Sequence, residues 1–137
     1  MNFLAVSSSA ACSFLAFDFG TRRVGVASGN TLTRTATPLR TVSAEGAARF
    51  DAIAALIREW HPAALVVGVP WHPDGAAHDN TRRAQRFARQ LEGRFHLPVH
   101  EVDERYSTVE AQSTGASDLD AASAAIILEQ FLRGIAA

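Results

Sequence analysis

The stretch from Phe14 to Ser28, FLAFDFGTRRVGVAS, carries one acidic residue, Asp18, near the end of an apolar run. Such a run predicts a strand that is covered on both faces. Gly20 allows a tight turn, and Val24 and Val26 resume an extended pattern, so the stretch predicts a β-hairpin. A carboxylate in a buried strand is costly unless it is hydrogen-bonded, paired with a cation or bound to a metal. Asp18 is therefore either a functional group or a turn or capping aspartate, and this stretch favours neither interpretation.

Composition indicates a single globular domain. The chain has 137 residues, of which 47% are hydrophobic and 20% charged, with a formal net charge of −1 that gives no overall attraction to nucleic acid. All 13 basic residues are arginine, for which a GC-rich genome is a simpler explanation than a preference for bidentate phosphate contacts. Cys12 is the single cysteine, which fits a reducing cytoplasm, and no apolar segment approaches the ~20 residues that span a membrane. We predict a flexible N-terminal extension over residues 1–13 and one domain over residues 14–135.

The middle of the chain predicts a strand, a helix and a second buried strand. Threonines alternate with other residues from Asn30 to Val42, and Pro38 favours an edge strand there. A helix is predicted to begin near Ser43 and Glu45 and to end at His61-Pro62. Its expected core stripe is Phe50, Ile53, Ile57 and Trp60.

A short apolar run, Ala63 to Val69, predicts a buried parallel strand. The loop that follows, Trp71 to Asn80, lies where ligands usually bind in open α/β sheets. Its two histidines, His72 and His78, have no fixed metal-binding spacing, so we interpret them as solvated.

A helix predicted from Thr81 to Phe95 combines an apolar stripe with many arginines. The stripe consists of Ala84, Phe87, Ala88, Leu91 and Phe95. The arginines are Arg82, Arg83, Arg86, Arg89 and Arg94, against one acid, Glu92, which gives a balance of +4. The helix follows the expected ligand loop, so a phosphate-binding surface and a solvated face are equally supported.

The last third of the chain brings two further groups of acids. A strand from Leu97 to Val102 ends in Asp103, Glu104 and Arg105, and strand alternation lets only one of these two acids share the face of Asp18. A capping-box pattern predicts a short helix from Ser107 to Gln112.

The closing helix is predicted from about Ser117 to Ile135. Asp118 and Asp120 fall in its first turn. Ser117 with Asp120 also fits a capping box, and acids at a helix N-terminus are stabilised by its dipole. Helix capping is therefore a strong alternative to a functional role for these acids.

Three acidic positions thus fall at comparable places: the end of the first strand, the end of the last strand and the first turn of the closing helix. Mg²⁺ and Mn²⁺ prefer carboxylate oxygen, and two such ions about 3.5–4 Å apart can hold the attacking water and the leaving oxygen of a phosphodiester. Without cations, three close carboxylates would repel one another. The pattern outlines a metal site for phosphodiester hydrolysis.

Several motifs resemble the YqgF family of bacterial proteins, also called RuvX. They are DFGTRRVGVA, TRTATPLRTV, VVGVPWHPDG, RRAQRFA, VDERYSTVEA and DAASAAIILEQFL, and they cover nearly all of residues 14–133. The resemblance implies an RNase H-like five-stranded mixed sheet flanked by helices, a cytoplasmic location and a nuclease that uses Mg²⁺ or Mn²⁺. The family's catalytic, metal-binding acids map onto Asp18, Glu104 and Asp120. Between Ala111 and Leu119 this chain departs from the family, because the segment has no positive charge.

The predicted activity is hydrolysis of structured RNA, with the 5′ end of pre-16S rRNA as the expected substrate. Arg23 and Arg105 are expected to orient or neutralise the scissile phosphate, and Arg82, Arg83 and Arg86 to contact the nucleic acid. The alternatives are a Holliday junction resolvase that cuts branched DNA and a ribosome-assembly factor without turnover. An ATP-binding fold of the actin type would need a second lobe that 137 residues cannot supply. We expect a monomer or a weak homodimer.

Overall fold

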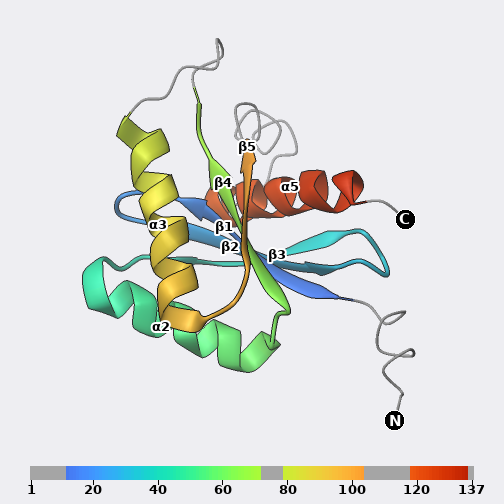
Figure 1. Ribbon diagram of the computed structural model, residues 1–137, viewed down its shortest axis with the longest axis horizontal. Coiled ribbons are helices and arrows are strands. Elements are labelled where there is room, and N and C mark those ends of the chain that lie inside the picture. Colours follow the sequence, from blue (N-terminus) through green and yellow to red (C-terminus); the bar gives the residue numbers. More distant parts are fainter. Residues whose placement is uncertain (1–11, 72–78, 104–117, 136–137) are drawn as a thin grey trace.

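The computed structural model describes residues 12–71, 79–103 and 118–135, which form one five-stranded sheet and three helices (Figure 1). The strands are β1 (Ser13–Phe19), β2 (Val24–Asn30), β3 (Ala36–Val42), β4 (Ala64–Val69) and β5 (Val99–Asp103). The helices are α2 (Gly46–Trp60), α3 (Asp79–Phe95) and α5 (Leu119–Gly134). The expected mixed sheet with flanking helices is confirmed. Ser13, which the sequence places in the N-terminal extension, is the first residue of β1.

The central strand of the sheet is β1, in the order β3-β2-β1-β4-β5. It pairs antiparallel with β2, which confirms the predicted hairpin, and parallel with β4. Asp18 is in register with Gly25 on β2 and with Gly68 on β4. Residues in register on neighbouring strands present their side chains on the same face. The carboxylate of Asp18 therefore lies between two positions that carry no side chain.

The two faces of the sheet have separate cores, because successive residues of a strand point to opposite sides. Leu15 and Phe17 of β1 belong to the larger core under α2 and α3, whereas Phe14 and Ala16 belong to the smaller core under α5. In Figure 1, α2 and α3 accordingly lie on one side of the sheet and α5 on the other. By this alternation Asp18 shares the face that α5 covers.

The predicted third strand is an edge strand, as Pro38 indicated, but it begins at Ala36. Asn30 belongs to β2, and its side-chain oxygen accepts hydrogen bonds from the main-chain N–H groups of Leu32 and Thr33 at 2.9 and 3.0 Å. This local turn separates β2 from β3 within a stretch that the sequence treats as continuous.

The helix α2 corrects one prediction of the core. Phe50 and Ile53 are buried as expected, but Trp60 is 42% exposed and Leu56 is buried in its place. Trp60 is the last residue of α2 and lines a surface hollow beside the start of β1. The predicted helix end is confirmed, since His61 adopts a left-handed conformation and its N–H donates to the carbonyl of Ile57 at 2.8 Å.

The helix α3 begins at Asp79, two residues earlier than predicted, and its apolar stripe is packed on the sheet as expected. The earlier start adds Asp79, so the helix contains five arginines and two acids, Asp79 and Glu92. Its net charge is therefore +3 instead of +4. The strand β5 includes Asp103, one residue beyond the predicted end. None of the helices formed by the described residues is long and apolar enough to cross a membrane.

Candidate active site

A cleft of about 650 Å³ opens at the carboxyl end of β1. It brings together Asp18 from β1 and Asp120 from the first turn of α5, two of the three predicted catalytic acids. The other polar residues around it are Thr21, Arg22, Arg23 and Asn80. Sequence patterns singled out Arg23 but gave no signal for Arg22 or Asn80 as lining residues. The cleft combines two carboxylates with two guanidinium groups, a mixture suited to cations and phosphates together.

Gly25 is the reason why Asp120 lies beside Asp18. A Cβ atom at Gly25 would overlap the main-chain carbonyl of Asp120, so only glycine lets α5 sit directly on the backbone of β2. Gly25 is also the partner of Asp18 in the β1–β2 register. The same close approach continues along α5, where Ala124 and Ala125 pack on Ala27.

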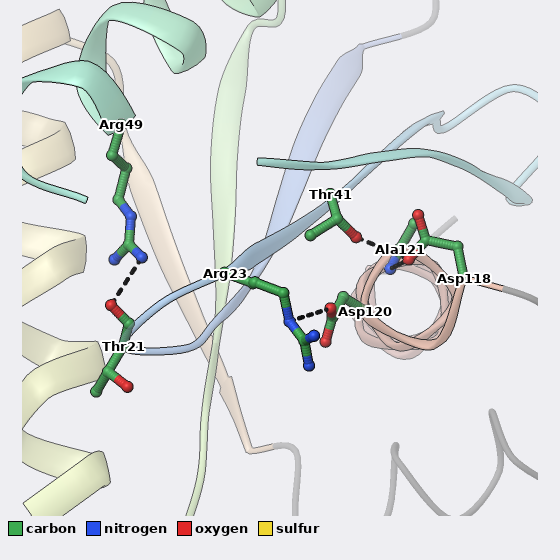
Figure 2. A network of polar contacts seen from close by, with 7 residues as sticks. All are labelled: Thr21, Arg23, Thr41, Arg49, Asp118, Asp120 and Ala121. Carbon is green, nitrogen blue, oxygen red and sulfur yellow. Dashed lines mark hydrogen bonds and ion pairs between the residues drawn. The ribbon is translucent and has the colours of Figure 1, made fainter. Parts of the chain in front are cut away.

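Asp118 fixes the start of α5. Its Oδ1 accepts a hydrogen bond from the N–H of Ala121 at 3.0 Å and another from the hydroxyl of Thr41 on β3 at 2.7 Å (Figure 2). The N-cap of the helix is therefore Asp118, which corrects the capping box that the sequence suggested for Ser117 and Asp120. Ser117 itself lies outside the described residues. With the cap supplied by Asp118, the side chain of Asp120 is directed to the cleft.

Arg23 forms an ion pair with Asp120, with 3.0 Å between Nε and Oδ2 (Figure 2). The Arg23 side chain is 65% exposed and that of Asp120 is 32% exposed. Exposed pairs of this kind contribute only about 0–1 kcal/mol. Arg23 can therefore exchange Asp120 for another anion, such as a phosphate, at little cost.

The two carboxylates fit a divalent cation by the chemistry of their donors, since carboxylate oxygens are preferred ligands of Mg²⁺ and Mn²⁺. Within residues 12–71, 79–103 and 118–135, no group of three or more histidine, cysteine, aspartate or glutamate side chains could hold a metal ion. The third predicted ligand, Glu104, and the predicted phosphate contact, Arg105, lie outside the described residues. So do the loop histidines and the short helix predicted after Ser107.

Arg49 of α2 holds the turn that carries the cleft arginines. It is only 6% exposed, and its Nε donates to the carbonyl of Ala44 at 2.8 Å. Its Nη2 donates to the carbonyl of Thr21 at 3.0 Å (Figure 2). Burial lowers the pKa of the Arg49 guanidinium, an effect that the nearby charge of Glu45 opposes. Nothing in the sequence pattern pointed to this residue, because it lies outside the apolar stripe predicted for the helix.

The arginines of α3 do not form one surface. Arg82 pairs with Asp79 at 3.6 Å, one turn earlier in the same helix. Arg83 and Arg86 instead line a separate hollow together with Arg49. The three predicted nucleic-acid contacts on this helix thus fall into two environments.

Comparisons with known proteins identify the family of this chain. A family model described as "RuvX: Holliday junction resolvase" matches residues 12–134. A relative from Polaromonas sp. (strain JS666 / ATCC BAA-500), named "Putative pre-16S rRNA nuclease", is 69% identical over 122 residues, which cover 89% of this chain and 88% of the relative. A relative of the same name from Burkholderia pseudomallei (strain 668) is 50% identical over 96% of this chain and 95% of its own length.

Among solved structures, this chain is similar to T. thermophilus RuvC in complex with a Holliday junction substrate. The TM-score is 0.55 at 14% identity, over 88% of this chain and 93% of that one. At this identity the likeness concerns the fold alone, and it confirms the expected RNase H-like architecture. By its family model and its curated relatives, the chain belongs to the RuvX family of nucleases.

Proposed function

We propose that this chain is a metal-dependent nuclease that processes the 5′ end of pre-16S rRNA. The observation that carries the proposal is the convergence of Asp18 and Asp120 in one cleft, from elements that are far apart in the sequence. The name of the curated relatives supplies the substrate. A protein that only binds nucleic acid would gain nothing from two carboxylates placed where phosphate must lie, which counts against an assembly factor without turnover.

Asp18 and Asp120 would hold Mg²⁺ or Mn²⁺, with Glu104 as the third ligand. We choose Glu104 over Asp103 as this ligand by strand alternation. Val102 packs in the core under α5, so Asp103 would point away from that face and Glu104 would point toward it. Bound there, one or two such cations supply Lewis-acid stabilisation of the phosphodiester and make the attacking water more acidic.

The chain's own residues position the substrate around these carboxylates. Arg23 pairs with Asp120 and would turn to the scissile phosphate when that carboxylate binds a cation, with Arg105 as a second contact. Gly25 lets the main chain of Asp120 lie directly on β2, at the position in register with Asp18. Arg49 keeps the turn that carries Arg23 in place through Thr21.

Incubation of the purified protein with pre-16S 5′-leader RNA and with a four-way DNA junction, each with Mn²⁺ or EDTA, tests the proposal. We expect Mn²⁺-dependent cleavage of the RNA and no cleavage by Asp18→Asn. The free energy of unfolding of this variant in EDTA should stay within about 1 kcal/mol of the wild type, since the change removes one of two like charges in the cleft. A large loss of stability in EDTA would instead assign Asp18 a structural role.

A second candidate is cleavage of branched DNA, which the description of the matching family favours. Symmetric cleavage of a junction requires two active sites, hence two copies of the chain. Preferential cutting of the junction over the leader RNA would support this candidate against the first.

A further inference from the structure

The hollow that Arg49, Arg83 and Arg86 line has a volume of about 300 Å³ and lies between α2 and α3, on the face of the sheet opposite α5. Its polar lining is Arg49, Arg83, Arg86 and Gln90. In the described part of the chain, no carboxylate lines it. Its volume is at the small end of the range for ligand pockets, which suits a single phosphate group better than an extended ligand.

The buried charge of Arg49 has no direct carboxylate partner among the described residues, although the charge of Glu45 acts on it. Its two hydrogen bonds go to main-chain carbonyls, and no carboxylate of residues 12–71, 79–103 or 118–135 forms an ion pair with it. Burial lowers the pKa of Arg49, and the nearby charge of Glu45 opposes this effect only in part. A bound anion would supply further compensation.

Arg83 and Arg86 reach the hollow because they are three residues apart on α3 and therefore neighbours on its surface. Their like charges would repel each other and Arg49 unless an anion lies between them. The other arginines of the helix have different environments: Arg82 pairs with Asp79, and the guanidinium of Arg94 lies 4.1 Å from the ring centre of Phe50.

The hollow adjoins the candidate active site. Phe19, at the end of β1, lines both, and its ring packs on Phe87 with 5.1 Å between ring centres. Arg49 is in contact with both as well, since it lines the hollow and donates to the carbonyl of Thr21 in the cleft. Within the described part of the chain, the end of β1 and the turn of residues 20–23 connect the two.

We propose that this hollow binds a backbone phosphate of the RNA substrate, next to but distinct from the phosphate that is cleaved. Arg49, Arg83 and Arg86 contact its oxygens, and Gln90 adds an amide donor. The occupant rests on the proposed function, whereas the anion site rests on the geometry alone. A substrate held at both places would be aligned across the turn that carries Arg22 and Arg23.

The test uses Asp18→Asn protein, which keeps the RNA intact, in binding titrations with a short RNA duplex across salt. The pocket variant carries Arg83→Gln and Arg86→Gln, and the matched control carries Arg82→Gln and Arg89→Gln, the same loss of charge from the same helix. Glutamine preserves helix propensity in both. We expect the pocket variant to bind at least about tenfold more weakly, because it loses charge-assisted hydrogen bonds, and to flatten the slope of log affinity against log salt by about 0.9. The control should show less than half of this change.

Equal losses in the two variants would overturn the proposal and make α3 a diffuse electrostatic surface. A second measurement separates the sources of phosphate: NMR of the Arg49 Nε–H resonance during titration with inorganic phosphate and with the duplex. A response to inorganic phosphate combined with unchanged RNA binding in the pocket variant would identify a free-anion site and also overturn it. Because neither measurement needs cleavage, a protein that cleaves no RNA but binds it through the pocket would contradict the proposed function and leave this site standing.

Discussion

At the scale of single residues, the ion pair between Arg23 and Asp120 makes a prediction about metal binding. If Asp120 is a metal ligand, Arg23 competes with the cation for the same oxygen, Oδ2. Arg23→Gln should therefore tighten Mn²⁺ binding, by up to about fivefold for a pair worth 0–1 kcal/mol, while it slows RNA cleavage. Thermal-shift titration with Mn²⁺ measures the first effect.

Arg22→Gln is the matched control, because Arg22 lines the same cleft and carries the same charge. It should change Mn²⁺ affinity less than Arg23→Gln, since it forms no ion pair with Asp120. If both variants bound Mn²⁺ equally more tightly, the cause would be the loss of a positive charge from the cleft and not the loss of the ion pair. Weaker binding in Arg23→Gln would exclude Asp120 as a ligand.

The two acids that follow Val102 make a second prediction for single residues. Val102 lies on the face of Asp18, and if the alternation of β5 continues past Asp103, Glu104 would share that face while Asp103 would not. Glu104→Gln should abolish Mn²⁺-dependent cleavage, whereas Asp103→Asn should keep substantial activity. The reverse result in a steady-state cleavage assay would mean that the strand ends one residue earlier than this alternation requires.

The sequence could single out Asp18 as a candidate because its signal is local: one charge inside an apolar run before a glycine turn. Asp120 was harder, because an acid in the first turn of a helix is equally well explained by the helix dipole. Arg49 could not be found from the sequence. Its hydrogen bond to Thr21 spans 28 residues, and no periodic pattern encodes a contact of that kind.

At the scale of elements, the approach of α5 to β2 depends on Gly25. Gly25→Ala places a methyl group on the main chain of Asp120, so the helix must move away from the sheet. We expect a loss of about 1–3 kcal/mol in the free energy of unfolding, as in other overpacked sites, together with loss of cleavage as Asp120 leaves Asp18. Chemical denaturation and the RNA assay measure the two effects.

Gly93→Ala in α3 is the control, since a Cβ at this helical position meets no atom within 4 Å. It should stabilise the protein by about 0.5–1 kcal/mol and leave cleavage unchanged. Wild-type stability in Gly25→Ala would show that α5 tolerates a shift, and would remove the structural reason for the glycine.

The cap of α5 gives a second prediction for the elements. Asp118→Ala removes the oxygen that accepts hydrogen bonds from the N–H of Ala121 and the hydroxyl of Thr41, and should lower the free energy of unfolding by about 0.5–2 kcal/mol. Cleavage should fall but persist, because Asp120 itself remains. Asp118→Asn keeps an acceptor oxygen and should be close to wild type in urea denaturation; a loss as large as that of alanine would assign the effect to charge.

Elements with strong periodicity could be predicted to within a few residues, as α3 and β4 demonstrate. Two predictions were wrong for physical reasons. The side chain of Asn30 accepts main-chain hydrogen bonds and forms a turn, so the strand is interrupted although the alternation of threonines in the sequence continues. Trp60 has the helical spacing of the apolar stripe of α2, but the helix ends at this residue and its side chain remains at the surface.

At the scale of the whole molecule, the fold could be predicted because composition, strand pattern and resemblance agree. The excess of positive charge on α3 was also visible in the sequence despite the net charge of −1, but the grouping of its arginines in space was not. The convergence of Arg83 and Arg86 with Arg49 depends on how α2 and α3 pack, which composition does not encode.

The exposed apolar surface predicts the oligomeric state. Within the described residues, the large apolar side chains that are exposed are Leu32 at 80%, Trp60 at 42% and Leu119 at 40%. They lie in the turn between β2 and β3, at the end of α2 and at the start of α5, and three such side chains are few for a stable interface, which buries about 800 Å² on each partner. We expect a monomer in sedimentation velocity at micromolar concentration, and RNA cleavage whose rate rises in simple proportion to the enzyme. A dimer at nanomolar concentration, with a rate that rises as the square of the enzyme below its dissociation constant, would contradict this. It would favour the two-site chemistry of a junction resolvase, because only paired active sites can cut two strands of a branched DNA symmetrically.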